Sequence, residues 1–303
     1  MNGSAKRESD GGLHSPPVGR RQFSFVSGRL RRREVVVARV WNDGHRFSDR
    51  VVLVTGAGGT LGGAIARGFG GEGASVVVGY RRSQSAAESV AAEIAAAGGS
   101  ACAAQLDVTD QASVDGFVAG ADTLYGRIDV LVNTAGRIDE ADTARFEDMS
   151  PDAATALLMV DVVGSMRMCH AVIPYMRRSG GGSIINFSST YGNGVTPENP
   201  INWVPVTYCA AKGAIRGFTA SLARDIAPDI RVNALAPGPI SGNWEQEWGI
   251  DPEHIEEAKA MNPMKRFGDP REIAETVMFL ASDGAGYVNG QVIHVEGGWV
   301  AAG

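Results

Sequence analysis

The sequence predicts an α/β protein in which about seven parallel strands form one sheet covered by helices on both faces. From residue 50 onward, short β-branched runs alternate with longer alanine-rich stretches. The short runs are apolar throughout, which is typical of strands buried on both faces of a parallel sheet. No repeat or linker interrupts residues 49–303, so we expect a single domain there.

The individual elements follow from the alternation of these runs. Strands are expected at residues 51–55, 75–78, 101–106, 128–133, 183–187, 230–234 and 291–295. Helices are expected near residues 60–72, 84–98, 110–125, 151–178, 207–227 and 270–282. Because strand–helix–strand crossovers are right-handed, this order predicts a doubly wound, Rossmann-type sheet.

The composition suits a soluble protein. Of the 303 residues, 44% are hydrophobic and 20% are charged. No uninterrupted apolar run approaches the ~18 residues that a membrane-spanning helix needs. Cys102, Cys169 and Cys209 are widely spaced and odd in number, which argues against a disulfide framework or a metal-binding pattern. We therefore expect a cytoplasmic protein.

The charge is distributed unevenly along the chain. Residues 1–50 carry eleven basic and five acidic side chains, whereas residues 51–303 carry 17 basic and 29 acidic ones. Residues 1–48 are rich in Arg, Gly and Ser and lack apolar periodicity, so we expect a disordered basic extension. A nucleic-acid-binding arm and a start codon placed too far upstream are the alternatives. The acidic remainder favours no nucleic-acid partner.

A glycine-rich loop follows the first expected strand directly. It reads Thr-Gly-Ala-Gly-Gly-Thr-Leu-Gly over residues 55–62 and leads into an alanine-rich helix. Glycines at this place let the backbone approach a pyrophosphate, which rests on the N-terminus of the following helix. The candidate cofactor-binding residues are Gly56, Gly58, Gly59, Thr60, Leu61 and Gly62.

Tyr208 and Lys212 form a candidate acid–base pair. Four residues apart on a helix, their side chains share one face, roughly 6 Å apart along the axis. A free tyrosine titrates near pH ~10, and a nearby ammonium group lowers that pKa toward neutrality. Ser189, nineteen residues earlier, could hydrogen-bond a substrate carbonyl while Tyr208 transfers the proton.

Several further motifs resemble those of the short-chain dehydrogenase/reductase superfamily. They are Asn-Thr-Ala-Gly at residues 133–136, a Pro-Gly pair at residues 237–238, and a glycine-rich segment at residues 290–298. The resemblance covers about residues 49–303 and points to the compact, single-domain branch. The glycine loop alone is more similar to the extended branch, which includes sugar-nucleotide epimerases.

The resemblance implies roles for individual residues. Ser189, Tyr208 and Lys212 would be catalytic, and Asp161 stands where the family has an asparagine that kinks a long helix and holds a water near the lysine. Further cofactor contacts would come from Asp107, Val108, Asn133, Ala135, Gly136, Tyr208, Lys212, Pro237, Gly238 and Ile240. Residues 238–266 would form a lid over the substrate, and the chain would assemble as a homotetramer or homodimer.

The residues after the second expected strand bear on the choice of cofactor. Tyr80 stands where a carboxylate would select NAD, and it is followed by Arg81 and Arg82. Two guanidinium groups can form charge-assisted hydrogen bonds to the 2′-phosphate of NADP. NADP is therefore the expected cofactor, with NAD as the alternative.

These features predict an NADP(H)-dependent oxidoreductase that transfers hydride reversibly between its cofactor and a carbonyl or secondary alcohol substrate. Two other functions stay open. Asp161 and Thr60 would suit a non-catalytic dinucleotide-binding sensor or scaffold, and the glycine loop alone would suit an NAD-dependent epimerase or dehydratase. The sequence does not identify the substrate.

Overall fold

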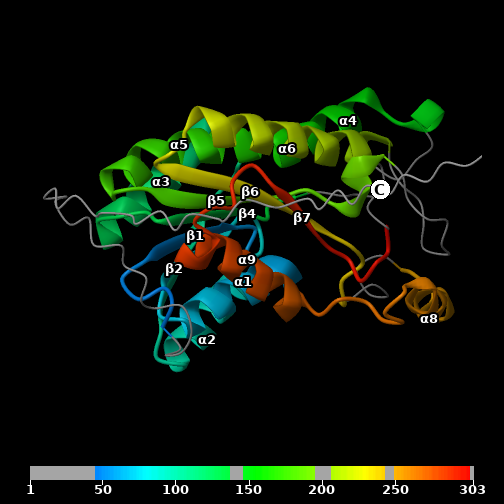
Figure 1. Cartoon of the computed structure of the whole chain (residues 1–303), viewed down its shortest axis with the longest axis horizontal. Helices are drawn as coiled ribbons and strands as arrows, with labels where there is room; N and C mark the ends of the chain where they lie inside the picture. Colours follow the sequence, from blue (N-terminus) through cyan, green and yellow to red (C-terminus); the bar gives the residue numbers. More distant parts are fainter. Residues whose placement is uncertain (1–44, 137–145, 195–205, 243–248, 301–303) are drawn as a thin grey trace, which may run out of the picture. The chain divides into compact units, whose positions relative to one another are not determined.

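A central parallel sheet confirms the predicted α/β architecture. The computed structural model describes residues 45–136, 146–194, 206–242 and 249–300. Within these residues, seven strands form one sheet in the order β3-β2-β1-β4-β5-β6-β7 (Figure 1). The order runs outward from β1 in both directions, which is the doubly wound arrangement expected for a Rossmann-type sheet.

The strands agree with the predicted runs to within a few residues. They are β1 (Val51–Thr55), β2 (Ser75–Tyr80), β3 (Ser100–Gln105), β4 (Val130–Asn133), β5 (Gly182–Phe187), β6 (Ile230–Pro237) and β7 (Val292–Val295). All six pairings are parallel. The carboxyl ends of all seven strands therefore meet at one edge, where ligands of such sheets bind.

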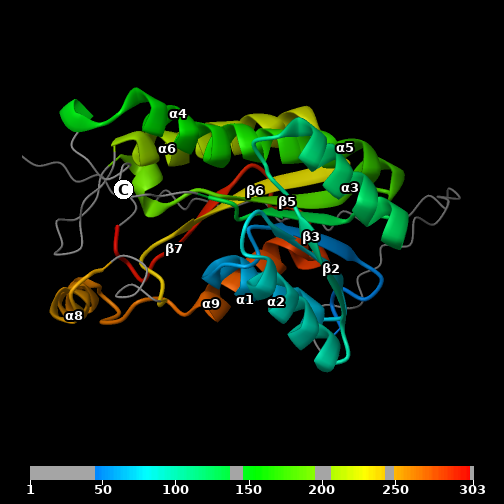
Figure 2. The same ribbon diagram turned by 180° about the vertical axis from the view of Figure 1, so that it is seen from behind.

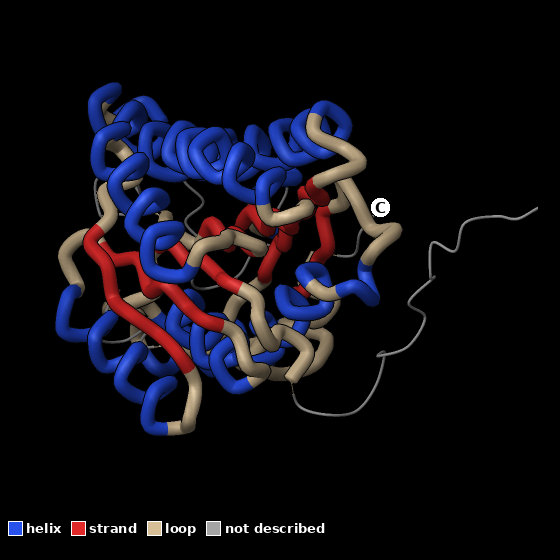
Figure 3. The backbone as a smooth tube through the Cα atoms, turned by 90° about the vertical axis from the view of Figure 1, so that its left-hand side faces the viewer, coloured by secondary structure: helices blue, strands red, loops and turns tan. Residues whose placement is uncertain are grey.

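Helices cover both faces of the sheet. On one face lie α1 (Thr60–Gly71), α2 (Gln84–Ala96) and α9 (Pro270–Ala281). On the other lie α3 (Gln111–Tyr125), α4 (Pro151–Leu158), α5 (Ser165–Arg178) and α6 (Val206–Asp225). Figures 1 and 2 show this division from opposite sides, and Figure 3 shows the strands in red between the two helical layers.

Two hydrophobic cores result, one on each face of the sheet. Val52 and Val54 of β1 belong to the core under α1, α2 and α9, whereas Val51 and Leu53 belong to the core under α3 and α5. Successive side chains of a strand point to opposite faces, so a strand covered on both sides needs apolar residues at every position. This requirement explains the unbroken apolar runs in the sequence.

The long helical stretch of residues 151–178 is interrupted. Between α4 and α5, Met159–Gly164 forms a π-helical segment, which we call the π segment. The whole stretch is long and apolar enough to cross a membrane by length and composition alone. Met168, Val172 and Met176 are buried against the sheet, however, so we interpret α5 as a core helix.

Two features differ from the predictions. The helix α8 (Pro252–Met261) lies inside the expected lid and was not predicted. The expected disorder of residues 1–48 is wrong for residues 45–48, because Phe47 is buried and packs edge-on against Phe69. The prediction for residues 1–44 lies outside the described residues, as does the part of the lid at residues 243–248.

Candidate active site

The glycine loop turns from β1 into α1 with very little space around its backbone. Gly56 has a φ of 64°, a left-handed conformation that favours glycine. A Cβ on Gly62 would lie 2.8 Å from both the Cα of Ala57 and the carbonyl oxygen of Gly56. Gly59 is the N-cap of α1 and provides no side-chain cap. The loop therefore presents backbone and an uncapped helix N-terminus at the carboxyl edge of the sheet.

Hydrogen bonds connect the end of β1, just before this loop, to the residues that follow β4. The Thr134 hydroxyl donates a hydrogen bond to the carbonyl oxygen of Thr55, and the Ala135 amide donates one to Thr55 Oγ1 at 2.9 Å. A Cβ on Gly56 would lie 3.0 Å from the Cα of Ala135. The segments containing Gly56 and Ala135 therefore pack directly against each other and form one continuous backbone wall. Sequence reasoning did not assign Thr134 this role.

The predicted adenine end is charged. Tyr80 ends β2, and Arg81 and Arg82 follow it with exposed side chains. Asp107 lies nearby and accepts hydrogen bonds from the Thr109 amide and hydroxyl at 2.9 and 2.7 Å. Burial would raise the pKa of Asp107, but these hydrogen bonds and the charges of the two arginines lower it.

Other residues predicted to contact the cofactor lie elsewhere around this edge. The Asn133 side chain is buried and its Nδ2 donates to Asn186 Oδ1 at 2.9 Å, so that side chain joins β4 to β5. Val108 is buried against Gly164 of the π segment. Gly136 lies beside the Asp161 carboxylate, since its Cβ would be 3.6 Å from Oδ2.

Ser189 lies directly after β5, where the strand leads into a short 3-10 turn. It is the N-cap of that turn, and its Oγ accepts a hydrogen bond from the Tyr191 amide at 3.2 Å. With a lone pair occupied by this amide, the hydroxyl proton of Ser189 is directed elsewhere. A hydroxyl held in this way is suited to donate to a carbonyl oxygen.

Tyr208 and Lys212 share one face of α6, as their spacing predicts. The Lys212 Nζ lies 5.3 Å from the centre of the Tyr208 ring. Ser189 lies close enough to the Tyr208 hydroxyl to lower its pKa, so the structure brings the three predicted catalytic residues together. Ser188, by contrast, is buried and donates from its Oγ to the Lys212 carbonyl oxygen at 2.8 Å. The Ser188 hydroxyl therefore satisfies a backbone group.

Asp161 lies in the π segment with its side chain against Lys212. Its Oδ2 is 2.8 Å from the Lys212 Nζ, and both side chains are buried. The burial shows that Asp161 is not a solvated helix residue. Its carboxylate forms a direct ion pair with the lysine.

The ion pair changes the electrostatics expected from sequence. Burial raises the pKa of Tyr208, the Lys212 charge opposes that rise, and the Asp161 charge adds to it. The net direction is upward, contrary to the lowering that the Tyr-x-x-x-Lys pattern predicts. Burial is the largest influence on Lys212 and would lower its pKa, but Asp161 and Tyr208 together outweigh it and the net shift is upward. The correction arises first from the burial of Tyr208 and then from the Asp161 charge, neither of which the two-residue motif includes.

The segment predicted to form the lid begins directly after β6. Pro237 ends β6, and the Gly238 amide donates to the Val295 carbonyl oxygen at 3.1 Å. A Cβ on Gly238 would lie 2.7 Å from the Cβ of Glu296, so this turn admits no side chain. Ile240 pairs with Gly268 in an isolated parallel bridge, which joins the two ends of the lid.

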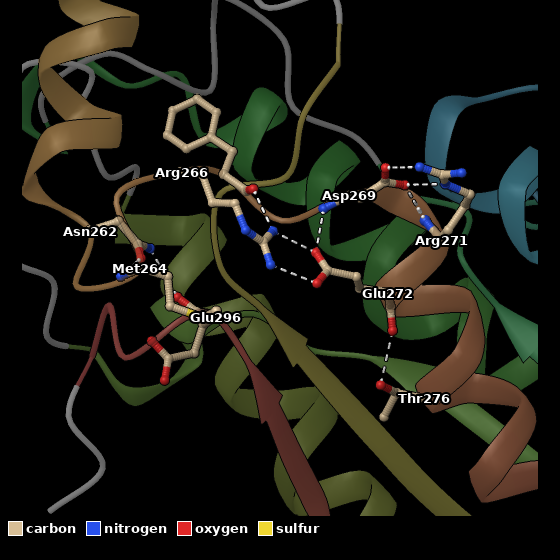
Figure 4. A network of polar contacts seen from close by, with 9 residues as sticks. Asn262, Met264, Arg266, Asp269, Arg271, Glu272, Thr276 and Glu296 are labelled. Atoms are coloured by element: carbon tan, nitrogen blue, oxygen red, sulfur yellow. Dashed lines mark hydrogen bonds and ion pairs between the residues drawn. The ribbon is translucent and has the colours of Figure 1, made fainter.

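A polar network anchors the lid between α8 and α9 (Figure 4). Arg266 forms a two-pronged ion pair with Glu272 at 2.7 Å for each contact. Asp269 and Glu272 form a reciprocal capping box at the start of α9. Asn262 donates from Nδ2 to the Glu296 carbonyl oxygen at 3.1 Å, which ties the end of α8 to the segment after β7. These contacts tie residues 262–266 of the predicted lid to α9 and to the segment after β7.

Comparisons with known proteins agree with this geometry. The family model described as enoyl-(acyl carrier protein) reductase matches residues 56–300. A 2,5-dichloro-2,5-cyclohexadiene-1,4-diol dehydrogenase from Sphingobium indicum is 36% identical over 260 residues, which is 84% of this chain and 98% of the relative. A short-chain reductase from Streptomyces niveus is 40% identical over 82% of this chain and 94% of its own length.

A ketoacyl reductase and a solved structure extend the comparison. The 3-oxoacyl-[acyl-carrier-protein] reductase of Thermotoga maritima is 36% identical over 84% of this chain and 99% of its own length. The crystal structure of a short-chain dehydrogenase/reductase from Burkholderia xenovorans is 32% identical, with a TM-score of 0.73 over 84% of this chain and 98% of the other. The chain therefore belongs to the short-chain dehydrogenase/reductase family and is a nicotinamide-dependent oxidoreductase of CH–OH or carbonyl groups.

Proposed function

We propose that this protein reduces the carbonyl group of a small-molecule substrate with NADPH, and oxidises the corresponding alcohol in the reverse direction. The observation that carries the proposal is the grouping of Ser189, Tyr208 and Lys212 beside the carboxyl end of β5. The Lys212 Nζ lies 5.3 Å from the centre of the Tyr208 ring and donates to the Phe187 carbonyl oxygen at the end of β5, two residues before Ser189. When bound, the nicotinamide cofactor supplies or accepts the hydride.

The residues fit a dinucleotide. Added side chains at Gly56 and Gly62 would strike backbone atoms of neighbouring segments, and α1 begins with an uncapped N-terminus. Such a surface suits a pyrophosphate, which needs close backbone approach and favours the positive end of a helix. We assign the pyrophosphate to residues 56–62 and the adenine end to Asp107 and Val108.

Each side chain at the reaction end has a task in this proposal. Ser189 donates its hydroxyl proton to the carbonyl oxygen and polarises it. Tyr208 transfers the proton to or from that oxygen. Lys212 contributes positive charge beside the phenol and binds the nicotinamide ribose. Such positioned acid–base groups contribute factors of ~10² to ~10⁴ in rate.

NADP is the proposed cofactor because the adenine end is basic. Arg81 and Arg82 are exposed, and their charges act on Asp107. Asp107 is occupied by Thr109, which leaves the two arginines available to a 2′-phosphate. Assembly as a homotetramer or homodimer and a cytoplasmic location stay predictions.

Single-turnover oxidation of NADPH across a panel of carbonyl compounds tests the proposal. The wild-type protein should oxidise NADPH with at least one member of the panel. Tyr208→Phe should lower turnover of that compound by ~10² to ~10⁴, with NADPH affinity nearly unchanged, because the ring still packs. A fully active Tyr208→Phe protein would contradict the assignment. NADPH binding without turnover of any compound would favour the non-catalytic sensor.

A further inference from the structure

Asp161 is a buried carboxylate whose surroundings are specific. The π segment places it at the inner face of the helix, where the Ser165 hydroxyl donates to its carbonyl oxygen at 2.8 Å. Its carboxylate contacts the Lys212 Nζ at 2.8 Å. Both polar ends of Asp161 are therefore engaged by this chain's own residues. A buried ion pair of this kind is costly to break by removing one partner.

The donors of Lys212 are largely committed. Its ammonium has three, of which one is donated to the Phe187 carbonyl oxygen at 3.2 Å, and the ammonium also lies 2.8 Å from Asp161 Oδ2 in an ion pair. The third is left for a bound ligand or for the phenol of Tyr208. The carboxylate thus lies closer to the lysine than the tyrosine ring does, at 2.8 Å against 5.3 Å.

Few other charges face Tyr208. Among the described residues, α6 contributes Lys212 and the thiol of Cys209, and the π segment contributes Asp161. The 3-10 turn after β5 contributes the neutral Tyr191 ring, 6.2 Å from the Tyr208 ring. The neighbouring side chains of α4 and the π segment, Leu157 and Val162, are apolar. The charge balance at Tyr208 therefore depends mainly on Asp161 and Lys212.

We infer that Asp161 is a positioning residue that fixes the resting state of the site as carboxylate, ammonium and neutral phenol, a state prepared to give a proton to a carbonyl. In that state the three buried groups carry no net charge. Loss of the phenol proton leaves a net charge of −1 in a buried site, which is costly. With asparagine at position 161, the same step would run from +1 to zero.

The inference rests on the proposed function and specifies its direction. In reduction, the carbonyl carbon receives the hydride of the reduced cofactor and the carbonyl oxygen receives the proton of Tyr208, which then regains a proton from water. In oxidation, Tyr208 must lose its proton before it can accept one from the alcohol. The protein cannot alter the overall equilibrium, so the bias acts on the pH range in which each direction is fast.

Ultraviolet titration of the tyrosinate band near 295 nm tests the charge state without turnover. The difference between each protein and its Tyr208→Phe counterpart isolates Tyr208 from the other five tyrosines. Asp161→Asn should move the titration of Tyr208 to lower pH by about one unit. Asp161→Glu keeps the charge and should stay near wild type. Asp152→Asn removes an exposed carboxylate from the start of the same helical stretch and should have no effect.

The second measurement is the pH dependence of the saturated rate of alcohol oxidation, which should move to lower pH in Asp161→Asn alone. An unshifted tyrosinate titration in Asp161→Asn would overturn the inference, as would an equal shift in Asp161→Glu. A shifted titration in a protein that turns over no substrate would support the charge assignment and contradict the proposed function. If Asp161→Asn does not fold, the same titration is performed on Asp161→Ser, which also removes the charge.

Discussion

The two ends of the proposed cofactor cleft lie at the same edge of the sheet but are built by different means. At the pyrophosphate end, the glycine loop and the Thr134–Gly136 segment shape the wall with backbone atoms, and added side chains would strike those atoms. At the reaction end, Asp161 and Lys212 are buried ionised side chains that compensate each other. The first end depends on the absence of side chains, and the second on the balance of charges.

This difference determines which substitutions each end tolerates. At the backbone wall the closest contacts are steric, so it is most sensitive to added atoms. A buried charge cluster tolerates a change in side-chain shape that keeps the charge. It responds to each added or removed charge, because burial weakens the screening of that charge by solvent and salt. Changes of side-chain size should therefore have the larger effect at the pyrophosphate end, and changes of charge should have the larger effect at the reaction end.

The largest effect is expected at Gly62. Gly62→Val would place side-chain atoms against Ala57, the Gly56 carbonyl and Thr134, so the loop must move away from its close contact with β4. Overpacking of this kind costs ~1–3 kcal/mol in stability, and we expect NADPH affinity to fall by about 100-fold, or ~2.7 kcal/mol. Isothermal titration calorimetry and thermal melting would measure both.

Gly71 provides the matched control. It lies at the exposed end of the same helix, and a Cβ there meets nothing within 4 Å. Gly71→Ala should leave NADPH affinity unchanged and preserve or slightly raise the melting temperature. An unchanged affinity in Gly62→Val would show that the backbone wall does not bind the cofactor.

Sequence reasoning was most successful where short-range rules decide the structure. The glycine loop, the strands and the shared face of Tyr208 and Lys212 follow from local spacing and from apolar runs. Sequence reasoning failed where the property of a residue depends on groups that are distant in the sequence. The upward shift of the Tyr208 pKa comes first from burial and then from Asp161, which is 47 positions away and is brought close by the packing of α6 against the π segment.

Other unpredicted features have similar causes. The π segment is not visible in the apolar periodicity, because its extra residue changes the phase of the helix only locally. Helix α8 contains four acidic or basic residues among its ten, and it lies in the segment that was predicted only as a lid, without secondary structure of its own. The contact of Lys212 with the Phe187 carbonyl uses backbone, which no side-chain pattern can reveal.

A smaller effect is expected from charge reversal at the adenine end. Arg81→Asp should weaken NADPH by about tenfold, because a charge-assisted contact is worth ~1.5–3 kcal/mol at most. The affinity for NADH should rise or stay equal, so the preference between the two cofactors is erased or inverted. Dissociation constants for both cofactors, measured by quenching of intrinsic fluorescence, would establish this.

Arg177→Asp controls for a general effect of charge. Arg177 is exposed and precedes β5, at the edge of the sheet opposite the cleft. The Arg177→Asp substitution should change neither the affinity for NADPH nor the affinity for NADH. Equal affinity of the unmodified protein for NADPH and NADH would contradict the role of Arg81.

The smallest effect is expected at Ser188, and it separates two neighbouring hydroxyls. Ser188 donates to the Lys212 carbonyl oxygen at 2.8 Å, whereas the Ser189 Oγ accepts from the Tyr191 amide and keeps its proton for a substrate in the proposed reaction. Ser188→Ala removes one buried hydrogen bond, which costs ~1 kcal/mol in stability. We expect less than about a tenfold loss in kcat, because such a bond only steadies the helix that carries Lys212. Ser189→Ala should lower kcat by ~10² or more, since it removes a donor to the reacting oxygen. Steady-state rates and melting temperatures of both variants would decide the matter. If Ser188→Ala lost as much activity as Ser189→Ala, the position of α6 would matter as much to the reaction as the hydroxyl that touches the substrate.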